Sequence, residues 1–206
     1  MDRTELGSAT RVGDEAVPGR SGIPTLITER LIPRAFVADD LDAYAAMTAD
    51  PETMRYLGDG KPLDRVATWR VLAIILGHWD LRGYGIWAMT ERATGRLLGR
   101  AGLYNPEGWP GLEVVWSVTR ERWGQGFATE AALASLDYAF EAVGADHIIS
   151  AIHSENGASI RVAEKLGERF EYSTTIEGRE RAVYGLSREN RRSYPPVLGT
   201  RSEQRK

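Results

Sequence analysis

The sequence predicts an α+β domain with a central mixed, mostly antiparallel sheet flanked by helices. Three observations lead to this prediction. The 206-residue chain is 42% hydrophobic and 27% charged, which is ordinary for a globular domain that can bury a core. Its middle carries two strand-like runs joined by a short glycine-containing turn, the pattern of a hairpin. Its second half alternates helical and strand-like segments.

The first elements lie before the hairpin. Apolar alternation begins over residues 25–36, where Pro33 favours an edge strand over a central one. A helix capped by Asp39 or Asp40 follows and ends before Pro51, which can open a second short turn. We expect the first helix to bury a face made of Leu41, Tyr44, Ala45 and Met47.

A long helical pattern covers about residues 63–81, and the glycines at 83 and 85 end it. Its expected buried face consists of Val66, Trp69, Leu72, Ala73 and Leu76. The hairpin follows, with strands over 84–91 and 96–104.

The second half begins with an apolar strand at 112–118 and a glycine elbow, and a helix over 127–142 follows with Gly144 at its C-cap. The remaining predicted elements are a strand at 147–154, a helix at 156–166, and strands at 170–175 and 181–186. The order of elements supports one α+β domain without an internal repeat.

The two ends of the chain differ from this core. Residues 1–22 are rich in glycine, charge and hydroxyl side chains without a hydrophobic period, so we expect a mobile lead-in without the apolar core of a secretion signal. We expect residues 23–188 to form the domain and residues 189–206 to form a solvated tail.

Composition excludes several kinds of site. The chain has no cysteine, which rules out disulfides, thiolate metal sites and a cysteine nucleophile. His78, His147 and His153 show no metal-ligand spacing, so we expect no metal. A net charge of −3 argues against nucleic-acid binding, and no apolar run reaches the ~18 residues of a membrane span. A cytoplasmic location is the simplest expectation.

The glycine elbow, WGQGFAT over residues 123–129, joins a strand to a helix N-terminus. Backbone N–H groups and the helix dipole make such a junction a site for anionic phosphates. A dinucleotide fingerprint needs a third glycine where Thr129 stands, and the Walker sequence GxxxxGK[ST] is absent. Neither of these two nucleotide signatures therefore applies.

The stretch WGQGFATEAA resembles the pyrophosphate loop of the GCN5-related N-acetyltransferase (GNAT) superfamily, in particular its ribosomal-protein N-terminal acetyltransferase branch, the RimJ/RimL type. Four other stretches resemble the same branch: TERLIPRAF, ADPETMRYLGDGKP, GYGIWAMTERATGRLLGRAGL and NGASIRVAEKLG. The resemblance covers about residues 25–186. It implies the acyl-CoA N-acyltransferase fold of that superfamily.

The resemblance implies acetyl-CoA as cosubstrate. Its pyrophosphate would lie on the backbone of Gly124, Gln125, Gly126, Phe127, Ala128 and Thr129. Trp123 stands where the superfamily usually has Gln or Arg, and Arg122 is either a phosphate contact or a surface arginine. The pantetheine arm would lie along Trp116, Ser117 and Val118, and an N–H group near Val118 would polarise the thioester carbonyl.

Acetyl transfer to an amine requires that the amine lose a proton. Strand alternation places Glu113 on one face with Val115 and Ser117, so Glu113 is the candidate base, directly or through water. The plainer alternative is a salt-bridged edge glutamate. Glu177, in the last predicted turn, is the rival base that the resemblance suggests.

The helix at 156–166 carries the remaining candidates. Many members of the superfamily have a tyrosine acid where this chain has Ala163. By resemblance, Ser159 would donate to the leaving sulfur, although a serine inside a helix can also bond to a carbonyl. Asn156 is expected to cap the helix and to touch the CoA arm.

We therefore expect an N-acetyltransferase that moves acetyl from acetyl-CoA to a primary amine. That amine is either the N-terminal α-amine of a protein or peptide, or belongs to a small molecule. The competing hypothesis is a non-catalytic acyl-CoA-binding regulatory module, which the missing tyrosine and Trp123 keep open. A homodimer is a further open possibility.

Overall fold

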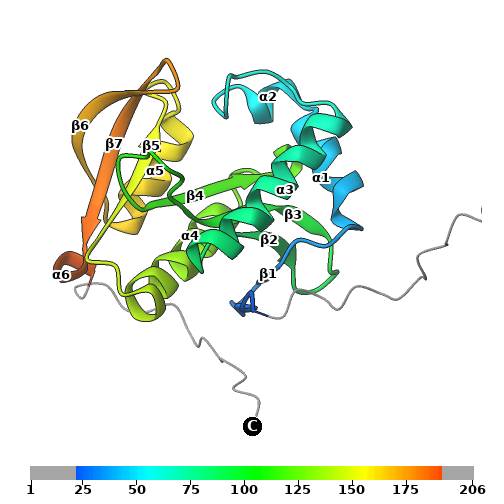
Figure 1. The fold of residues 1–206 in the computed structure, drawn as a ribbon, viewed down its shortest axis with the longest axis horizontal. Helices are drawn as coiled ribbons and strands as arrows, with labels where there is room; N and C mark the ends of the chain where they lie inside the picture. Colours follow the sequence, from blue (N-terminus) through cyan, green and yellow to red (C-terminus); the bar gives the residue numbers. More distant parts are fainter. Residues whose placement is uncertain (1–21, 192–206) are drawn as a thin grey trace, which may run out of the picture.

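A computed structural model describes residues 22–191, and the predictions for residues 1–21 and 192–206 lie outside the described part. The described chain forms one seven-stranded sheet with helices on both faces (Figure 1). Its strands are β1 (Leu31–Arg34), β2 (Ile86–Glu91), β3 (Leu97–Tyr104), β4 (Glu113–Val118), β5 (His147–Ile152), β6 (Arg169–Ile176) and β7 (Arg179–Ser187). Their order in the sheet is β1-β2-β3-β4-β5-β7-β6.

All neighbouring strands are antiparallel except the central pair β4 and β5. The predicted mixed, mostly antiparallel sheet is confirmed. Strand β1 lies at one edge, as Pro33 predicts, because proline has no N–H group to donate to a second neighbour.

The helices are α1 (Asp40–Thr48), α2 (Pro51–Met54), α3 (Arg65–Arg82), α4 (Phe127–Tyr138), α5 (Gly157–Leu166) and α6 (Arg188–Arg191). A 3₁₀ turn, η1 (Arg120–Arg122), precedes α4, and a π turn, η2 (Ala139–Val143), extends it to Gly144. Each predicted helix is present within a few residues of its expected bounds.

Side-chain alternation in β2 shows how the layers are built. Ile86 and Ala88 pack with residues of α1 and α3 on one face of the sheet. Met89, which points the other way, packs with Phe127 and Ala131 of α4. Strand β2 is therefore buried at every position but the last, as expected for a strand that is covered on both faces.

The predicted buried face of α3 is confirmed at Leu72, which is buried, and at Leu76, which packs half-buried against the core, but it is wrong elsewhere. Val66 and Trp69 are 60% and 59% exposed, and Ala73 is also exposed. Besides Leu72, the helix buries Thr68, Ile75, His78 and Trp79. Apolar residues surround most of this helix, so its hydrophobic pattern does not define one face. Tertiary hydrogen bonds define it: Thr68 Oγ1 bonds to Thr48 Oγ1 at 2.7 Å, and Trp79 Nε1 donates to the Ile86 carbonyl at 2.9 Å.

The described chain ends in the short helix α6, which follows β7 directly. Residues 189–191, expected to belong to the tail, complete the short helix α6. The Arg191 side chain is buried and forms an ion pair with Asp137 of α4. This contact attaches the end of the described chain to the helix that follows the glycine elbow.

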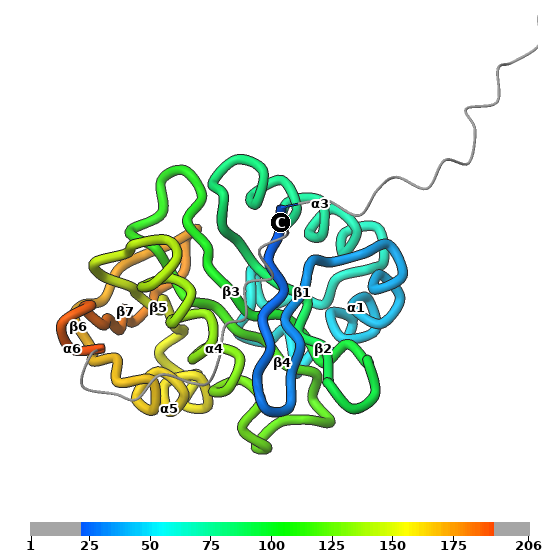
Figure 2. The backbone as a smooth tube through the Cα atoms, turned by 90° about the horizontal axis from the view of Figure 1, so that it is seen from below, coloured from blue at the N-terminus to red at the C-terminus, as the bar shows by residue number. Residues whose placement is uncertain are grey.

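Strands β4 and β5 pair at a single position, near the N-terminal end of each strand. Glu113 pairs with Ile149, and the Ile149 N–H donates to the Leu112 carbonyl at 2.9 Å. From Val115 to Val118, the edge of β4 that faces β5 has no strand partner among the described residues. We call this opening in the sheet the notch. Figure 2 shows β5, β6, β7 and α5 gathered on one side of the molecule, and β1, β2, α1 and α3 on the other.

Candidate active site

The first part of the site is the N-terminus of α4. Gly124 and Gly126 have φ angles of 72° and 84°, a region that glycine adopts without strain. Gly126 is the N-cap residue, and no side chain of a described residue caps the helix. The side chain of Asp64 caps α3, and that of Asn156 caps α5. The first N–H groups of α4 are thus available to an anion, which the helix dipole also favours.

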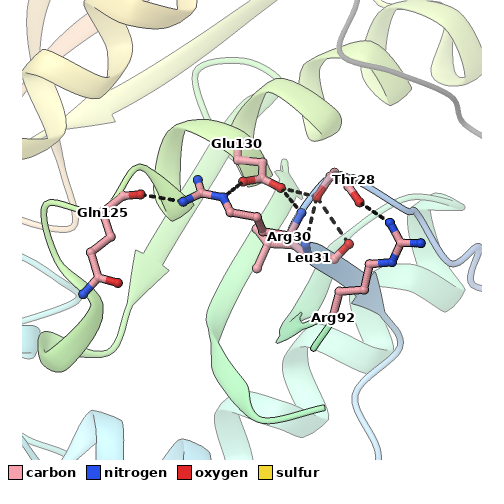
Figure 3. A network of polar contacts seen from close by, with 6 residues as sticks. All are labelled: Thr28, Arg30, Leu31, Arg92, Gln125 and Glu130. Atoms are coloured by element: carbon pink, nitrogen blue, oxygen red, sulfur yellow. Dashed lines mark hydrogen bonds and ion pairs between the residues drawn. The ribbon is translucent and has the colours of Figure 1, made fainter. Parts of the chain in front are cut away.

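A network behind this N-terminus fixes its position (Figure 3). The Arg30 guanidinium donates to the Gln125 carbonyl at 2.8 Å and to Glu130 Oε2 at 2.7 Å. The backbone N–H of Arg30 and the hydroxyl of Thr28 donate to the other Glu130 oxygen at 2.8 and 2.5 Å. Burial opposes ionisation of Glu130, but these hydrogen bonds hold its pKa below the ordinary value. Sequence reasoning missed Arg30 and Glu130, because they are 100 residues apart.

The side chains of the loop itself are also engaged. Arg122 is half-buried and pairs with Glu91 at 3.0 Å, so its charge already has a partner. Trp123 donates from its indole nitrogen to the Val118 carbonyl at 2.7 Å, while the residue stays 48% exposed. The Gln125 amide donates to the Glu121 carbonyl at 3.1 Å. Because these side chains are already hydrogen-bonded within the protein, the backbone N–H groups of the loop are the groups that remain for binding an anion.

The second part of the site is a cavity of about 360 Å³ on the α1 and α3 face of the sheet. Glu113, Val115 and Ser117 line it, as strand alternation predicts. The side chains of Trp116 and Val118 point the other way and pack in the core beside α4. Their part in the notch is therefore limited to backbone groups. The notch lies between the cavity on one face and the N-terminus of α4, which packs on the other.

Glu113 is the buried carboxyl group at the narrow end of the notch. It accepts hydrogen bonds from the Trp109 indole at 2.7 Å and from the Ala151 N–H at 3.0 Å. No described residue forms an ion pair with it, so the alternative of a salt-bridged edge glutamate is wrong. Burial raises the pKa of Glu113 to about 7, while the two hydrogen bonds and the charges of Arg181 and Arg100 oppose this rise. A carboxyl group with a pKa near neutrality is suited to general acid–base chemistry.

The other two catalytic candidates lie in different places. Glu177 is exposed in the β6–β7 turn at a φ of 49°, and it also lines the cavity. Ser159 lies in the first turn of α5, outside the lining of the cavity. Its hydroxyl accepts from the Asn156 amide at 3.0 Å, and its N–H donates to Asn156 Oδ1 at 3.2 Å. Asn156 is thus the helix cap that its sequence position predicts.

Three residues of the cavity were not found from the sequence. Trp109 comes from the loop before β4, Arg100 from β3 and Arg181 from β7. Arg100 did give a signal, since it is the one charged residue in the strand LLGRAGLY. A lone arginine in an apolar strand indicates a buried polar environment. Trp109 and Arg181 gave none, because only tertiary contacts bring them to Glu113.

A second buried carboxyl group, that of Glu168, lies on the face of the sheet that α4 covers. Glu168 is 3% exposed, and its Oε1 accepts from the Ser150 hydroxyl at 3.0 Å. Burial raises the pKa of Glu168 well above the ordinary value. Ala163, which stands where many superfamily members have a tyrosine, is fully buried.

Residues 22–191 contain no group of three or more His, Asp or Glu side chains arranged to hold a metal ion. None of the helices over this range is long and apolar enough to span a bilayer.

Comparison with known proteins assigns the class. The family described as "Acetyltransferase (GNAT) domain" matches residues 30–169, which places the chain among the acetyltransferases. The chain belongs to the GNAT N-acetyltransferase family. It is similar to the Bacillus subtilis "uncharacterized protein YkkB", with 33% identity over 73% of this chain and 87% of that protein.

Solved structures agree with this assignment. An acetyltransferase from Agrobacterium tumefaciens has a TM-score of 0.72 and 28% identity, covering 91% of this chain and 100% of its own. RimJ of Mycobacterium smegmatis, solved with CoA-disulfide, has a TM-score of 0.65 and 17% identity over 81% of this chain and 87% of its own. The likeness to the RimJ branch is therefore a likeness of fold.

Proposed function

We propose that this protein transfers acetyl from acetyl-CoA to a primary amine by direct attack, with Glu113 as the general base. The observation that carries the proposal is the position of Glu113. Its carboxyl group is buried, has a pKa of about 7, and lies where the cavity meets the notch. A base is most effective when its pKa is close to the working pH.

The residues present fit acetyl-CoA. The uncapped N–H groups of Phe127, Ala128 and Thr129 would bind its pyrophosphate, with Gly124 and Gly126 keeping the backbone accessible. The unpaired edge of β4 offers backbone groups to the amides of the pantetheine arm. When bound, acetyl-CoA supplies the activated acetyl group as a thioester.

The chemical step needs one proton acceptor and one stabiliser of charge. The amine nitrogen forms a bond to the acetyl carbonyl carbon, its proton passes to Glu113 directly or through water, and the carbon–sulfur bond breaks. Ser159 is the candidate to donate a hydrogen bond to the departing thiolate, which takes its proton from solvent. An N–H group near Val118 would bind the carbonyl oxygen as charge develops, a contribution typically of about 3 kcal/mol.

Glu177 is the second candidate base. It lines the same cavity, but its side chain is exposed, whereas that of Glu113 is buried. We therefore favour Glu113. The substitution Glu177→Gln lies in the same cavity, so its rate of acetyl transfer is the matched comparison for that of Glu113→Gln.

A thiol-release assay with acetyl-CoA and a panel of amines, including peptides with free N-termini, tests the proposal. We expect release of CoA thiol that depends on the amine and falls sharply in Glu113→Gln. Binding of acetyl-CoA without release by any amine would favour the non-catalytic acyl-CoA-binding module instead. Absence of thermal stabilisation by acetyl-CoA would refute both readings.

A further inference from the structure

Two arginines line the cavity without an acidic partner. Arg100 and Arg181 form no ion pair with any described residue. Two other half-buried arginines are paired, Arg34 with Asp40 at 2.7 Å and Arg122 with Glu91 at 3.0 Å. A half-buried guanidinium group that forms no ion pair is a suitable site for an anion that enters this cavity.

Both guanidinium groups lie close to the candidate base. Their charges act on the Glu113 carboxyl group and oppose the effect of burial on its pKa. Arg181 makes only long hydrogen bonds, to the Tyr56 and Gly58 carbonyls at 3.4 and 3.5 Å. The Arg181 guanidinium group therefore has N–H donors left for a ligand. Arg100 lies by the hydroxyl of Tyr44, which is a neutral partner.

The rest of the cavity wall is largely apolar. Its apolar and aromatic residues come mainly from the α1–α3 side of the molecule, and they include Met54, Tyr56, Leu63, Val71 and Ile75. A volume of about 360 Å³ is that of a small-molecule site. Such a wall favours a ligand with a hydrophobic body next to its charged groups.

These features define what the acceptor must carry. An amine must reach Glu113, an anionic group must reach Arg100 and Arg181, and the two groups must be adjacent because their binding groups are adjacent. An α-amino acid carries an amine and a carboxylate on one carbon. A peptide N-terminus carries a neutral amide in place of that carboxylate.

We propose that the acceptor is a free α-amino acid with an apolar or aromatic side chain, whose carboxylate is bound by Arg100 and Arg181 while its amine faces Glu113. This inference rests on the proposed acetyltransferase function. The new bond joins the α-nitrogen to the acetyl carbon, the carbon–sulfur bond breaks, and the α-nitrogen gives one proton to Glu113.

The test compares phenylalanine, phenylalanine amide and a phenylalanyl dipeptide by thiol release, with acetyl-CoA saturating. We expect kcat/KM for phenylalanine to exceed that for the amide by about tenfold or more, since a charged hydrogen-bond pair is lost with the amide. The amide amine is the less basic of the two, so at about pH 8 more of it is deprotonated. The expected preference therefore runs against the intrinsic reactivity.

The variants Arg181→Met and Arg100→Met give the decisive readout, the ratio of kcat/KM for acid over amide. We expect this ratio to fall towards one in each, and to be retained in Arg100→Lys, which keeps the charge. Arg179→Met is the matched control, because Arg179 lies in the same strand and donates to Gly58 without lining the cavity. It should keep the wild-type ratio.

The outcomes separate the two proposals. If the amide or the dipeptide reacts as well as the free amino acid, the inference is overturned while the acetyltransferase proposal stands. An unchanged acid-to-amide ratio in both arginine-to-methionine variants, folded by circular dichroism, overturns it as well. If no amine releases thiol, both proposals fail.

Discussion

At the residue scale, the burial of Glu113 decides the chemistry. The carboxyl group accepts two hydrogen bonds, from Trp109 and from Ala151, yet its pKa lies at about 7 because desolvation is the larger effect. The same strand without the surrounding loops would leave an ordinary glutamate. Function at this position therefore follows from packing more than from residue type.

The first prediction concerns the pH dependence of the rate. Because Glu113 accepts a proton as carboxylate, kcat/KM should rise with pH and level off above an apparent pKa of about 7. Glu113→Gln should lower kcat/KM by about 100-fold or more and abolish its rise with pH, with little change in acetyl-CoA affinity. Glu177→Gln is the comparison. A wild-type rate in Glu113→Gln together with a slow Glu177→Gln would transfer the role to Glu177.

The second prediction concerns Glu168. Its folded-state pKa is raised, so its contribution to stability is fully present below the unfolded pKa and is lost as the pH rises through the folded pKa. Glu168→Gln keeps a partner for Ser150 but cannot ionise. Urea unfolding should show a smaller loss of stability from about pH 5 to about pH 8 in this variant. Glu164→Gln, exposed on α5, is the control, and an equal effect there would contradict the assignment.

At the element scale, α4 and the loop before it form one unit with β1. Arg30 comes from the turn before β1 and binds both the loop carbonyl of Gln125 and the Glu130 side chain of α4. The loop therefore does not depend on its own side chains for position. This arrangement explains how a loop with two glycines can present a fixed row of N–H groups.

The third prediction tests the anion-binding role of that row. Gly126→Asp should weaken acetyl-CoA binding at least about tenfold more than Gly126→Ala, measured by calorimetry, because both side chains share the strained φ of 84° but only one is negative. Gly144→Asp places the same change at the other end of the helical segment, at a φ of 80°, and should leave binding unchanged. Equal affinities in the two Gly126 variants would overturn the placement of the pyrophosphate.

The fourth prediction concerns the Arg30 network. Arg30→Met removes two hydrogen bonds from a guanidinium that is partly exposed, so we expect a loss of about 1–2 kcal/mol in the free energy of unfolding. Acetyl-CoA affinity should fall as well, because the loop loses its support. Arg92→Met is a suitable control, since the only bond of the Arg92 side chain to this region is a 3.5 Å contact with the Thr28 carbonyl, and its backbone bond to Arg30 is kept. The prediction fails if both variants unfold at the same urea concentration.

At the scale of the whole molecule, the notch divides the sheet into two parts that meet at one residue pair. The cavity lies on one face of the sheet, and the N-terminus of α4 packs on the other. Arg179 and Arg181 also connect the parts, by bonding to carbonyls of the loop between α2 and α3. A cosubstrate in the notch would therefore contact both halves.

The fifth prediction follows from this division. Acetyl-CoA at 100 times its Kd should stabilise the fold by about 2.7 kcal/mol and slow hydrogen exchange at Trp116 and Val118, whose N–H groups lie on the unpaired edge of β4. Inorganic pyrophosphate occupies only the α4 N-terminus, so it should stabilise the protein without protecting that edge. Equal protection by both ligands would place the pantetheine arm elsewhere.

Much of the architecture could be predicted from the sequence. The hairpin, the caps at Gly144 and Gly167, and the strand face shared by Glu113 and Ser117 follow from local periodicity and turn chemistry. The buried face of α3 could not be predicted, because its apolar residues surround the helix. The partners Arg100, Arg181 and Trp109 could not be predicted either, because each reaches Glu113 only through long-range packing.

By itself, the sequence determined the element order, the glycine elbow and the resemblance to an acetyltransferase, since each rests on residues that are neighbours in the chain. Only the tertiary structure decided that α4 begins without a side-chain cap, that Glu113 is buried with a pKa of about 7, and that two arginines lack acidic partners. The reason is physical: desolvation and charge pairing depend on which distant groups exclude water from a site, and no local pattern records that.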